Sequence, residues 1–250
     1  MSRIFAFTSQ KGGVGKTTSS AALAAASAEL GKRVLLVDVD PQAGLTTSLG
    51  FDHAAFEKTV YHAFIDSADL DAITCDTRML NVALIPASLD LAGAEAELLG
   101  EVAWERTLKD ALAPVTDRYD LVVLDCPPSL GVLTTNALVA ADSAIVPLQC
   151  EYLALRALKQ LQTIVSKVRR KANPGLRVRI LRTLYSSHTL HGREVFDEIA
   201  RVSPDEVLQT YIKRTVCLAD AAAAGETILS YATSSDAARA YRELAKELRL

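Results

Sequence analysis

The segment Lys11-Gly12-Gly13-Val14-Gly15-Lys16-Thr17-Thr18 joins a short apolar run at 4–8 to a stretch of helical composition at 17–30. Glycines let the backbone turn so that successive N–H groups point inward at phosphate oxygens, and the following helix adds the positive end of its dipole. A strand, a glycine-rich loop, Gly-Lys-Thr and a helix, in that order, are typical of a phosphate-binding loop. The segment therefore predicts a nucleotide site rather than a turn without a ligand.

The residue types in this loop predict separate roles. Lys16 would place its charge on the β- and γ-phosphates, and the Thr17 hydroxyl would bind Mg²⁺. We expect the loop to bind ATP or ADP, with contributions from Lys11, Gly12, Gly13, Val14, Gly15, Lys16, Thr17 and Thr18.

Outside the loop, short apolar runs alternate with longer helical stretches. The runs that resemble strands buried on both faces are 4–8, 34–39, 82–86, 121–125, 144–148 and 178–185. The stretches of helical composition are 17–30, 88–112, 133–141, 152–171, 191–201 and 235–249, while 50–78 is less regular and fits short helices. Such alternation predicts an α/β fold, a mostly parallel twisted sheet with helices on both faces. We expect a single P-loop NTPase domain over 1–250, without an N-terminal helix-turn-helix domain.

Two of the predicted strands end in acidic residues. Asp38 and Asp40 close the second strand, and Asp125 closes the run 121–125. In a parallel sheet, ligands bind at the carboxyl ends of the strands, so these acids should face the same crevice as the phosphate loop. A single Asp at a strand end is usually a turn or cap residue, but two such strand ends beside a phosphate loop predict metal-assisted phosphoryl transfer. We assign Asp125 and Asp38 to Mg²⁺, and Asp40 to the attacking water.

The net charge of the chain indicates no particular class of partner, but the charged residues are distributed unevenly along the sequence. The 250 residues are 50% apolar and 23% charged, with a formal net charge of −3, which argues against disorder. The range 156–193 contains ten Lys or Arg residues and no Asp or Glu. Such a stretch is either an anion-binding surface or an ordinary solvated helix face beside a strand.

Cysteine usage and the chain start indicate a cytoplasmic protein. The four cysteines, Cys75, Cys126, Cys150 and Cys217, form no C-x-x-C pair, which predicts reduced thiols rather than disulfides or a metal site. No signal peptide precedes the first strand pattern, and no apolar run approaches the ~18 residues of a membrane span.

The phosphate loop departs from the general pattern in one respect: Gln10 stands at the first glycine position and Lys11 follows it. In this the chain resembles the deviant Walker A family, which includes the ParA/Soj partition ATPases, MinD and the nitrogenase iron protein. The resemblance implies an ATP-dependent homodimer in which Lys11 reaches the nucleotide of the other subunit and stabilises charge there, as an arginine finger does.

Further matches resemble the ParA/Soj branch: QKGGVGKTT, GKRVLLVDVDPQ, YDLVVLDCPPSLG, NALVAAD, VPLQCEYLAL and AYRELAKEL. They imply a Mg²⁺-dependent ATPase that partitions chromosome or plasmid DNA, binds the nucleoid non-specifically when ATP-bound, and responds to a ParB-type activator. A relative that positions a protein cargo without binding DNA is the alternative.

Two other branches fit less well. A MinD-like protein would end in a basic amphipathic membrane anchor, whereas the apolar stripe near the end of this chain (Ala237, Tyr241, Leu244, Ala245 and Leu248) is mixed with acids and should pack on the sheet. An iron protein would need paired cysteines, and a small-molecule ligase would need a substrate site that the sequence does not indicate.

The chain departs from ParA/Soj relatives where DNA binding is concerned. Ser186-Ser187-His188-Thr189 replaces a D-x-R-T pattern, Ile212–Cys217 replaces I-P-R-N-V-R, and DPQAGLT replaces DPQGNAT. Other cations can compensate, because non-specific affinity depends on the number of phosphates neutralised. The candidates for DNA contact are Lys167, Arg169, Arg170, Lys171, Arg193, Lys213 and Arg214.

Overall fold

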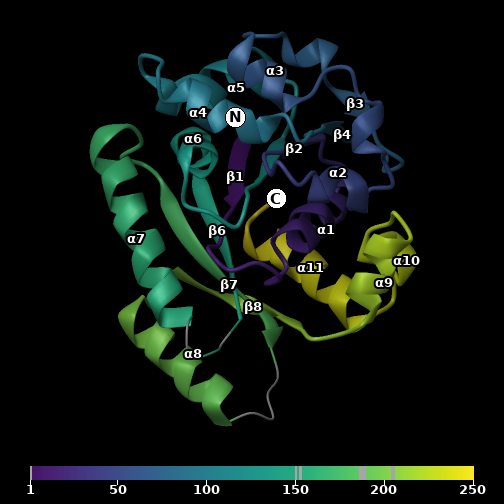
Figure 1. Ribbon diagram of the computed structural model, residues 1–250. Coiled ribbons are helices and arrows are strands. Elements are labelled where there is room, and N and C mark those ends of the chain that lie inside the picture. Colours follow the sequence, from purple (N-terminus) through teal and green to yellow (C-terminus); the bar gives the residue numbers. More distant parts are fainter. Residues whose placement is uncertain (1, 150, 152–153, 186–189, 204–205) are drawn as a thin grey trace.

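A computed structural model of the chain describes residues 2–149, 151, 154–185, 190–203 and 206–250; the side chains of 190–194 and 202 are outside this description. Eight strands form one sheet in the order β3-β4-β2-β5-β1-β6-β7-β8 (Figure 1). The strands are β1 (Arg3–Phe7), β2 (Val34–Asp38), β3 (Cys75–Asp76), β4 (Val82–Ile85), β5 (Leu121–Asp125), β6 (Ser143–Leu148), β7 (Arg177–Tyr185) and β8 (Val207–Lys213). All neighbours are parallel except β3 and β4. The predicted mostly parallel sheet is confirmed.

Helices cover both faces of this sheet. One face carries α3 (Val60–Ile65), α4 (Leu91–Leu98), α5 (Thr107–Thr116), α6 (Val132–Ala140), α7 (Ala154–Lys171) and α8 (Leu190–Val202). The other carries α1 (Lys16–Glu29), α2 (Gly44–Ser48), α9 (Cys217–Ala223), α10 (Ile228–Tyr231) and α11 (Asp236–Glu247). Among the described residues there are also short 3₁₀ turns, which include η1 (His53–Ala55), η2 (Leu70–Ala72) and η3 (Trp104–Arg106).

The central strands are apolar throughout because they are buried on both faces. In β2, Leu35 and Val37 pack into one hydrophobic cluster, while Val34 and Leu36 pack into the other. All four are fully buried. The burial of each such side chain stabilises the folded state by about 1.5–3 kcal/mol relative to leaving it exposed to water. The central strands were therefore recognisable from composition.

Two local predictions differ from the structure. The stretch 88–112 is not one helix: α4 ends at Leu98 and α5 begins at Thr107, with Ala103 in the left-handed region (φ 56°) between them, a backbone conformation that a helix cannot include. Strand β8 was not predicted, because an edge strand lacks a continuous apolar run: Leu208 and Ile212 are buried, whereas Gln209 is exposed.

Helix α11 packs on strand β8 of the sheet, as the stripe predicts, and also on α1. Ala237, Tyr241, Leu244, Ala245 and Leu248 are each at most 8% exposed. The same apolar face is therefore occupied inside the molecule, and among the described residues no helix has the length and apolarity to cross a bilayer.

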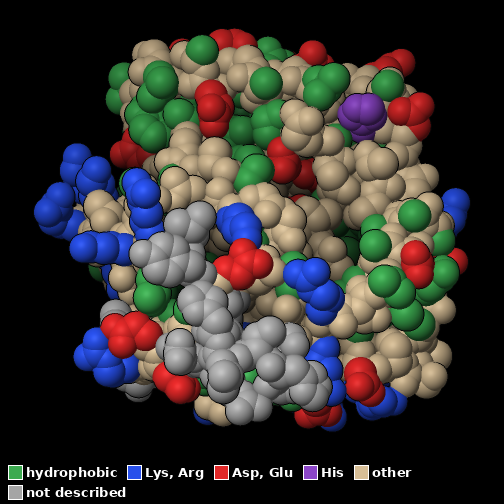
Figure 2. Space-filling view, turned by 60° about the horizontal axis from the view of Figure 1, so that its bottom comes forward, with side chains coloured by type: hydrophobic (Ala, Val, Ile, Leu, Met, Phe, Trp, Pro, Cys, Tyr) green, Lys and Arg blue, Asp and Glu red, His purple; other side chains and the backbone are tan. Residues whose placement is uncertain are grey.

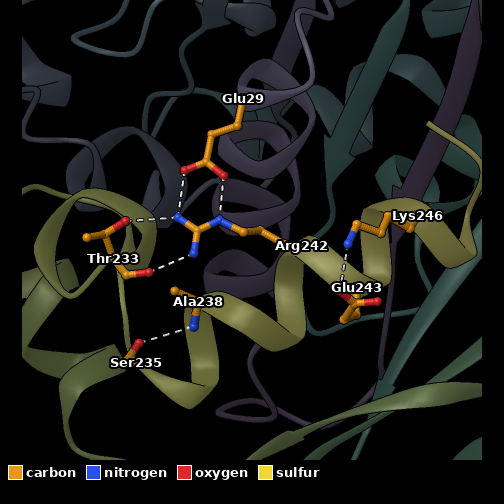
Figure 3. Close-up of polar contacts among 7 residues, drawn as sticks. All are labelled: Glu29, Thr233, Ser235, Ala238, Arg242, Glu243 and Lys246. Atoms are coloured by element: carbon orange, nitrogen blue, oxygen red, sulfur yellow. Dashed lines mark hydrogen bonds and ion pairs between the residues drawn. The ribbon is translucent and has the colours of Figure 1, made fainter.

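Polar contacts fasten this pairing at the surface (Figure 3). Both nitrogens Nε and Nη2 of Arg242 donate to the Glu29 carboxylate, at 2.6 and 2.8 Å, and the same guanidinium reaches Thr233. Ser235 caps α11 by accepting from the Ala238 N–H. In the interior, the hydroxyls of Tyr241 and Ser19 are 2.9 Å apart. Helix α1, which follows the phosphate loop, is thus held along its length.

Candidate nucleotide-binding site

The phosphate loop leads from β1 into α1 at the carboxyl edge of the sheet. Gly13 and Gly15 have φ of 71° and 88°, which L side chains rarely adopt, so glycine is required where the loop curls. Val14 between them is 2% exposed. Its carbonyl accepts a hydrogen bond of 2.7 Å from Thr183 Oγ1 on β7, and this bond fixes the loop against the sheet.

Lys16, the first residue of α1, is a buried cation. It is 7% exposed, and it forms none of the ion pairs found among the described residues. The charge of Lys16 acts on Asp125 without a direct ion pair, so an anionic ligand at close range would compensate more fully for the removal of this charge from water. This arrangement suits the phosphate contact that the sequence assigns to Lys16.

Asp125 lies at the end of β5 and is tied to the start of α1. Its carboxylate accepts hydrogen bonds from Thr17 Oγ1 at 2.7 Å and from Ser20 Oγ at 2.9 Å. Complete burial raises the pKa of Asp125 to about 6, and the two hydroxyls and the charge of Lys16 oppose the rise. Thr17 and Asp125, both assigned to Mg²⁺ from sequence, are thus in direct contact.

Asp38 is the neighbour of Asp125 across the β2–β5 ladder. Burial raises the pKa of Asp38 to about 7, with a further contribution from the charge of Asp125. Its carboxylate accepts from the N–H and the hydroxyl of Thr46, each at 2.8 Å, and from the Asp40 N–H at 3.2 Å. Asp38 therefore holds the segment that follows β2 in place, a contact that its sequence assignment did not foresee.

Asp40 is only partly buried, and its Oδ1 accepts from the Gln42 N–H at 2.9 Å. The chain then turns through Ala43, which is in the left-handed region (φ 50°), into α2. A Cβ built on Gly44 would lie 3.8 Å from Thr17 Oγ1, so this segment borders the predicted metal ligand. The predicted water-positioning residue and the phosphate loop thus lie at the same edge of the sheet.

Lys11 contacts residues of its own chain. Its Nζ lies 2.5 Å from Glu151 Oε2 and 3.2 Å from Gln149 Oε1, in the segment after β6. The two charged side chains are 46% and 51% exposed. The contact that sequence reasoning gives to Lys11, with the nucleotide of another subunit, would require it to leave Glu151.

These residues fit a nucleotide with its metal. The positive-φ glycines form a cradle, and the buried Lys16 adds a cation beside it. Thr17 and Asp125 form a hydroxyl–carboxylate pair. Together these groups supply the donors and oxygen ligands that Mg²⁺-bound phosphates need. Lys16 would hold the phosphates, and Thr17 and Asp125 would hold the metal.

The candidate DNA-binding residues do not lie together. Lys167, Arg170 and Lys171 are exposed near the end of α7. That end lies at the amino edge of the sheet, because Asn173 just beyond it donates to the Ala141 carbonyl that precedes β6.

Lys213 and Arg214 are exposed at the opposite, carboxyl edge, where β8 ends and where Lys213 lies 3.5 Å from Asp236. Arg169 is used internally: its Nε donates to the Leu176 carbonyl. The Arg193 side chain and His188 are outside the described residues. On the face drawn in Figure 2, several Lys and Arg side chains gather at the left edge, and others lie apart with Asp and Glu side chains beside them.

Sequence reasoning missed three residues that build the site. Ser20 could have been found, because it follows Thr17 by three positions and so lies on the same face of α1. Thr46 and Thr183 gave no local signal; Thr183 lies 169 positions from Val14.

Known proteins resemble the whole chain. A family model described as an AAA domain, AAA_31, matches residues 2–178. The sporulation initiation inhibitor protein Soj of Bacillus subtilis is 45% identical over 249 residues, covering 99% of this chain and 98% of that protein. The chromosome partitioning protein ParA of Myxococcus xanthus is 38% identical over 247 residues, covering 98% and 87%.

Solved structures show the same likeness. Cobyrinic acid a,c-diamide synthase from Mycobacterium smegmatis, solved with bound ADP and magnesium, is 43% identical with a TM-score of 0.88, covering 100% of this chain and 94% of that one. The structure of the same protein with a bound ATP analogue and magnesium has 42% sequence identity and a TM-score of 0.88. The match covers 100% of this chain and 95% of that one.

Proposed function

The chain belongs to the ParA/Soj family of P-loop ATPases, and from that premise we propose that it is an ATP-dependent dimer that moves DNA by binding it non-specifically. In this proposal, Mg²⁺ and ATP bring two protomers together through the carboxyl edges of their sheets. A ParB-type activator then triggers hydrolysis and separates the protomers. The cargo is chromosomal or plasmid DNA.

The burial of Lys16, which forms no direct ion pair with any residue that the structure describes, is the observation that carries the nucleotide part of the proposal. Lys16 lies at the start of α1, between the left-handed Gly15 and the Thr17–Asp125 hydrogen bond. A buried cation beside backbone donors recognises an anion, and a carboxylate beside a hydroxyl recognises the metal that accompanies a triphosphate.

The residues divide the chemical work as follows. Bound Mg²⁺ would neutralise charge on the phosphates. Lys16 and the loop N–H groups orient the triphosphate, and Asp125 keeps Thr17 in position. Asp40, at the edge of the site, would orient the attacking water, and Lys11 of a second copy would stabilise the charge that develops in transfer.

The exposed cations at the two edges of the sheet would have different positions in a dimer that binds DNA. If two protomers meet through their carboxyl edges, Lys213 and Arg214 of both copies lie on the assembled dimer near the nucleotides. The set at the end of α7 (Lys167, Arg170 and Lys171) then lies on the far sides. With about three phosphate contacts from each protomer, log K should fall with a slope of about −5 against log[salt].

The decisive experiment measures molecular size with ADP, ATP and a slow-hydrolysing ATP analogue, with and without non-specific DNA. We expect a dimer with the analogue, and no nucleotide binding in Lys16→Ala. Lys11→Ala should bind ATP as a monomer; a dimer that survives this change would contradict the contact in trans.

The DNA arm of the experiment compares two variants. Replacing Lys213 and Arg214 by Gln should reduce both DNA affinity and the salt slope, whereas replacing Lys167, Arg170 and Lys171 should reveal whether the other edge contributes. If DNA affinity does not change with salt, or if no DNA binds with the analogue present, the proposed DNA binding is wrong. Positioning of a protein cargo would then be the form of the partition function that is left.

The likeness to the Mycobacterium smegmatis chain suggests a second candidate, ATP-dependent amide formation on a small molecule. The two candidates are separated by what stimulates ATP turnover. A partition ATPase should respond to DNA together with an activator protein, and a synthase should respond to a small-molecule acid with an amide donor.

A further inference from the structure

The two halves of the phosphate loop differ in how firmly they are held. The second half is fixed: Val14 is buried, and its carbonyl accepts from Thr183 Oγ1. The first half is loosely packed, because Gly12 and Gly13 are exposed and a Cβ built on either would meet nothing within 4 Å. Lys11, which precedes these glycines, can therefore change direction without disturbing the part of the loop that holds phosphate.

In the free protomer, the direction of Lys11 is set by two acceptors from another segment. Glu151 Oε2 and Gln149 Oε1 lie 2.5 and 3.2 Å from its Nζ, although Glu151 is 140 positions away in sequence. All three residues line a cavity of about 370 Å³ between the loop and the start of α7. Lys11 is thus paired within its own protomer, although its side chain is 46% exposed.

We propose that Glu151, assisted by Gln149, holds Lys11 within its own protomer and thereby sets the protein concentration at which the ATP-bound dimer forms. This inference rests on the proposed function. Each protomer must break the Lys11–Glu151 pair before Lys11 can enter the other subunit, so two such pairs oppose each dimerisation. Glu151 acts through Lys11 and is a positioning residue.

The exposure of the Lys11–Glu151 pair limits how much it can change the dimer dissociation constant. A half-exposed ion pair is screened by water, so each pair contributes little, but two break in every dimer. We expect their removal to tighten dimerisation about fivefold, which corresponds to ~1 kcal/mol. Glu151 therefore adjusts the protein concentration at which the dimer forms, and it does not block dimerisation completely.

The test compares dimer dissociation constants of wild type, Glu151→Gln and Glu226→Gln by analytical ultracentrifugation with the slow-hydrolysing ATP analogue and Mg²⁺, without DNA. Glu226 is exposed and forms none of the ion pairs found among the described residues, so its variant matches the change in net charge. Analogue affinity is also measured at protein concentrations below dimerisation, where a merely structural role of Glu151 would alter it.

The expected result is an about fivefold lower dissociation constant for Glu151→Gln, with Glu226→Gln and monomer nucleotide affinity unchanged. A dissociation constant equal to or above that of wild type overturns the role of Glu151 while leaving the ATP-dependent dimer intact. A wild type that binds the analogue and stays monomeric overturns the proposed function, and this inference with it.

Discussion

The hydrogen bond from Thr183 to Val14 offers a sharp test of how the phosphate loop is built. Thr183→Val keeps the β-branched shape of the side chain and removes only the hydroxyl. Both residues are 2% exposed and the bond is 2.7 Å long, so water cannot easily replace the lost donor. The Val14 carbonyl would be left without this partner in the interior.

The expected cost follows from that burial. Losing a buried hydrogen bond and stranding its acceptor costs about 1–3 kcal/mol of unfolding free energy, and we expect about 2 kcal/mol here. For a chain of this size, each kcal/mol corresponds to roughly 2–4 °C, so Tm should fall by about 4–8 °C. Because the loop would then have to be ordered on binding, nucleotide affinity should fall by about three- to tenfold.

Thermal and denaturant unfolding give the stability change, and calorimetry with ATP and Mg²⁺ gives the affinity. Thr163→Val is the matched control: Thr163 is exposed, and its hydroxyl donates to the Lys159 carbonyl within α7, so its removal should change stability by less than about 0.5 kcal/mol. If Thr183→Val changes Tm no more than Thr163→Val does and leaves affinity intact, the idea that β7 anchors the loop is wrong.

Three further outcomes are expected. Asp40→Ala should keep ATP binding and trap the dimer without hydrolysis, as measured by phosphate release and size; unchanged turnover would refute its role in positioning water. Burial raises the pKa of Tyr241 to about 12, above its unfolded value near 10. Its contribution to stability is thus complete below pH 10 and is lost as the pH rises towards 12, by ~1.4 kcal/mol per pH unit. The difference in unfolding free energy between wild type and Tyr241→Phe should therefore shift by about 1 kcal/mol between pH 10 and 11, where the unfolded phenol is only partly ionised at the start. A difference independent of pH would count against the buried phenol. Arg242→Gln removes the paired contacts with Glu29, and should lower stability by about 0.5–1 kcal/mol at low salt and by less at high salt; a loss that salt does not reduce would exclude an electrostatic origin.

Local patterns in the chain were sufficient for the fold class and for the heart of the site. A strand buried on both faces must be apolar throughout, so β2 and β5 could be recognised without knowing their neighbours. The phosphate loop is equally local, because its glycines, Lys16 and Thr17 follow one another within a few positions. Knowing that parallel strands present their carboxyl ends at one edge was enough to place Asp38 and Asp125 at the same edge.

Contacts between distant segments had no such local signal. Strand β8 was missed because an edge strand is only half apolar, and the break between α4 and α5 depends on one left-handed residue, Ala103.

The order of residue types along the chain is enough to show that a phosphate loop, a parallel sheet and acidic strand ends occur together in this protein. Tertiary structure alone decided that Thr183 supports Val14, that Lys11 meets Glu151, and that the cations of α7 and β8 lie at opposite edges of the sheet. This difference arises because local backbone conformation and burial determine the periodic pattern of apolar and polar residues within a short segment. The side chains that meet across the molecule depend on strand order and on helix direction, which no short segment contains.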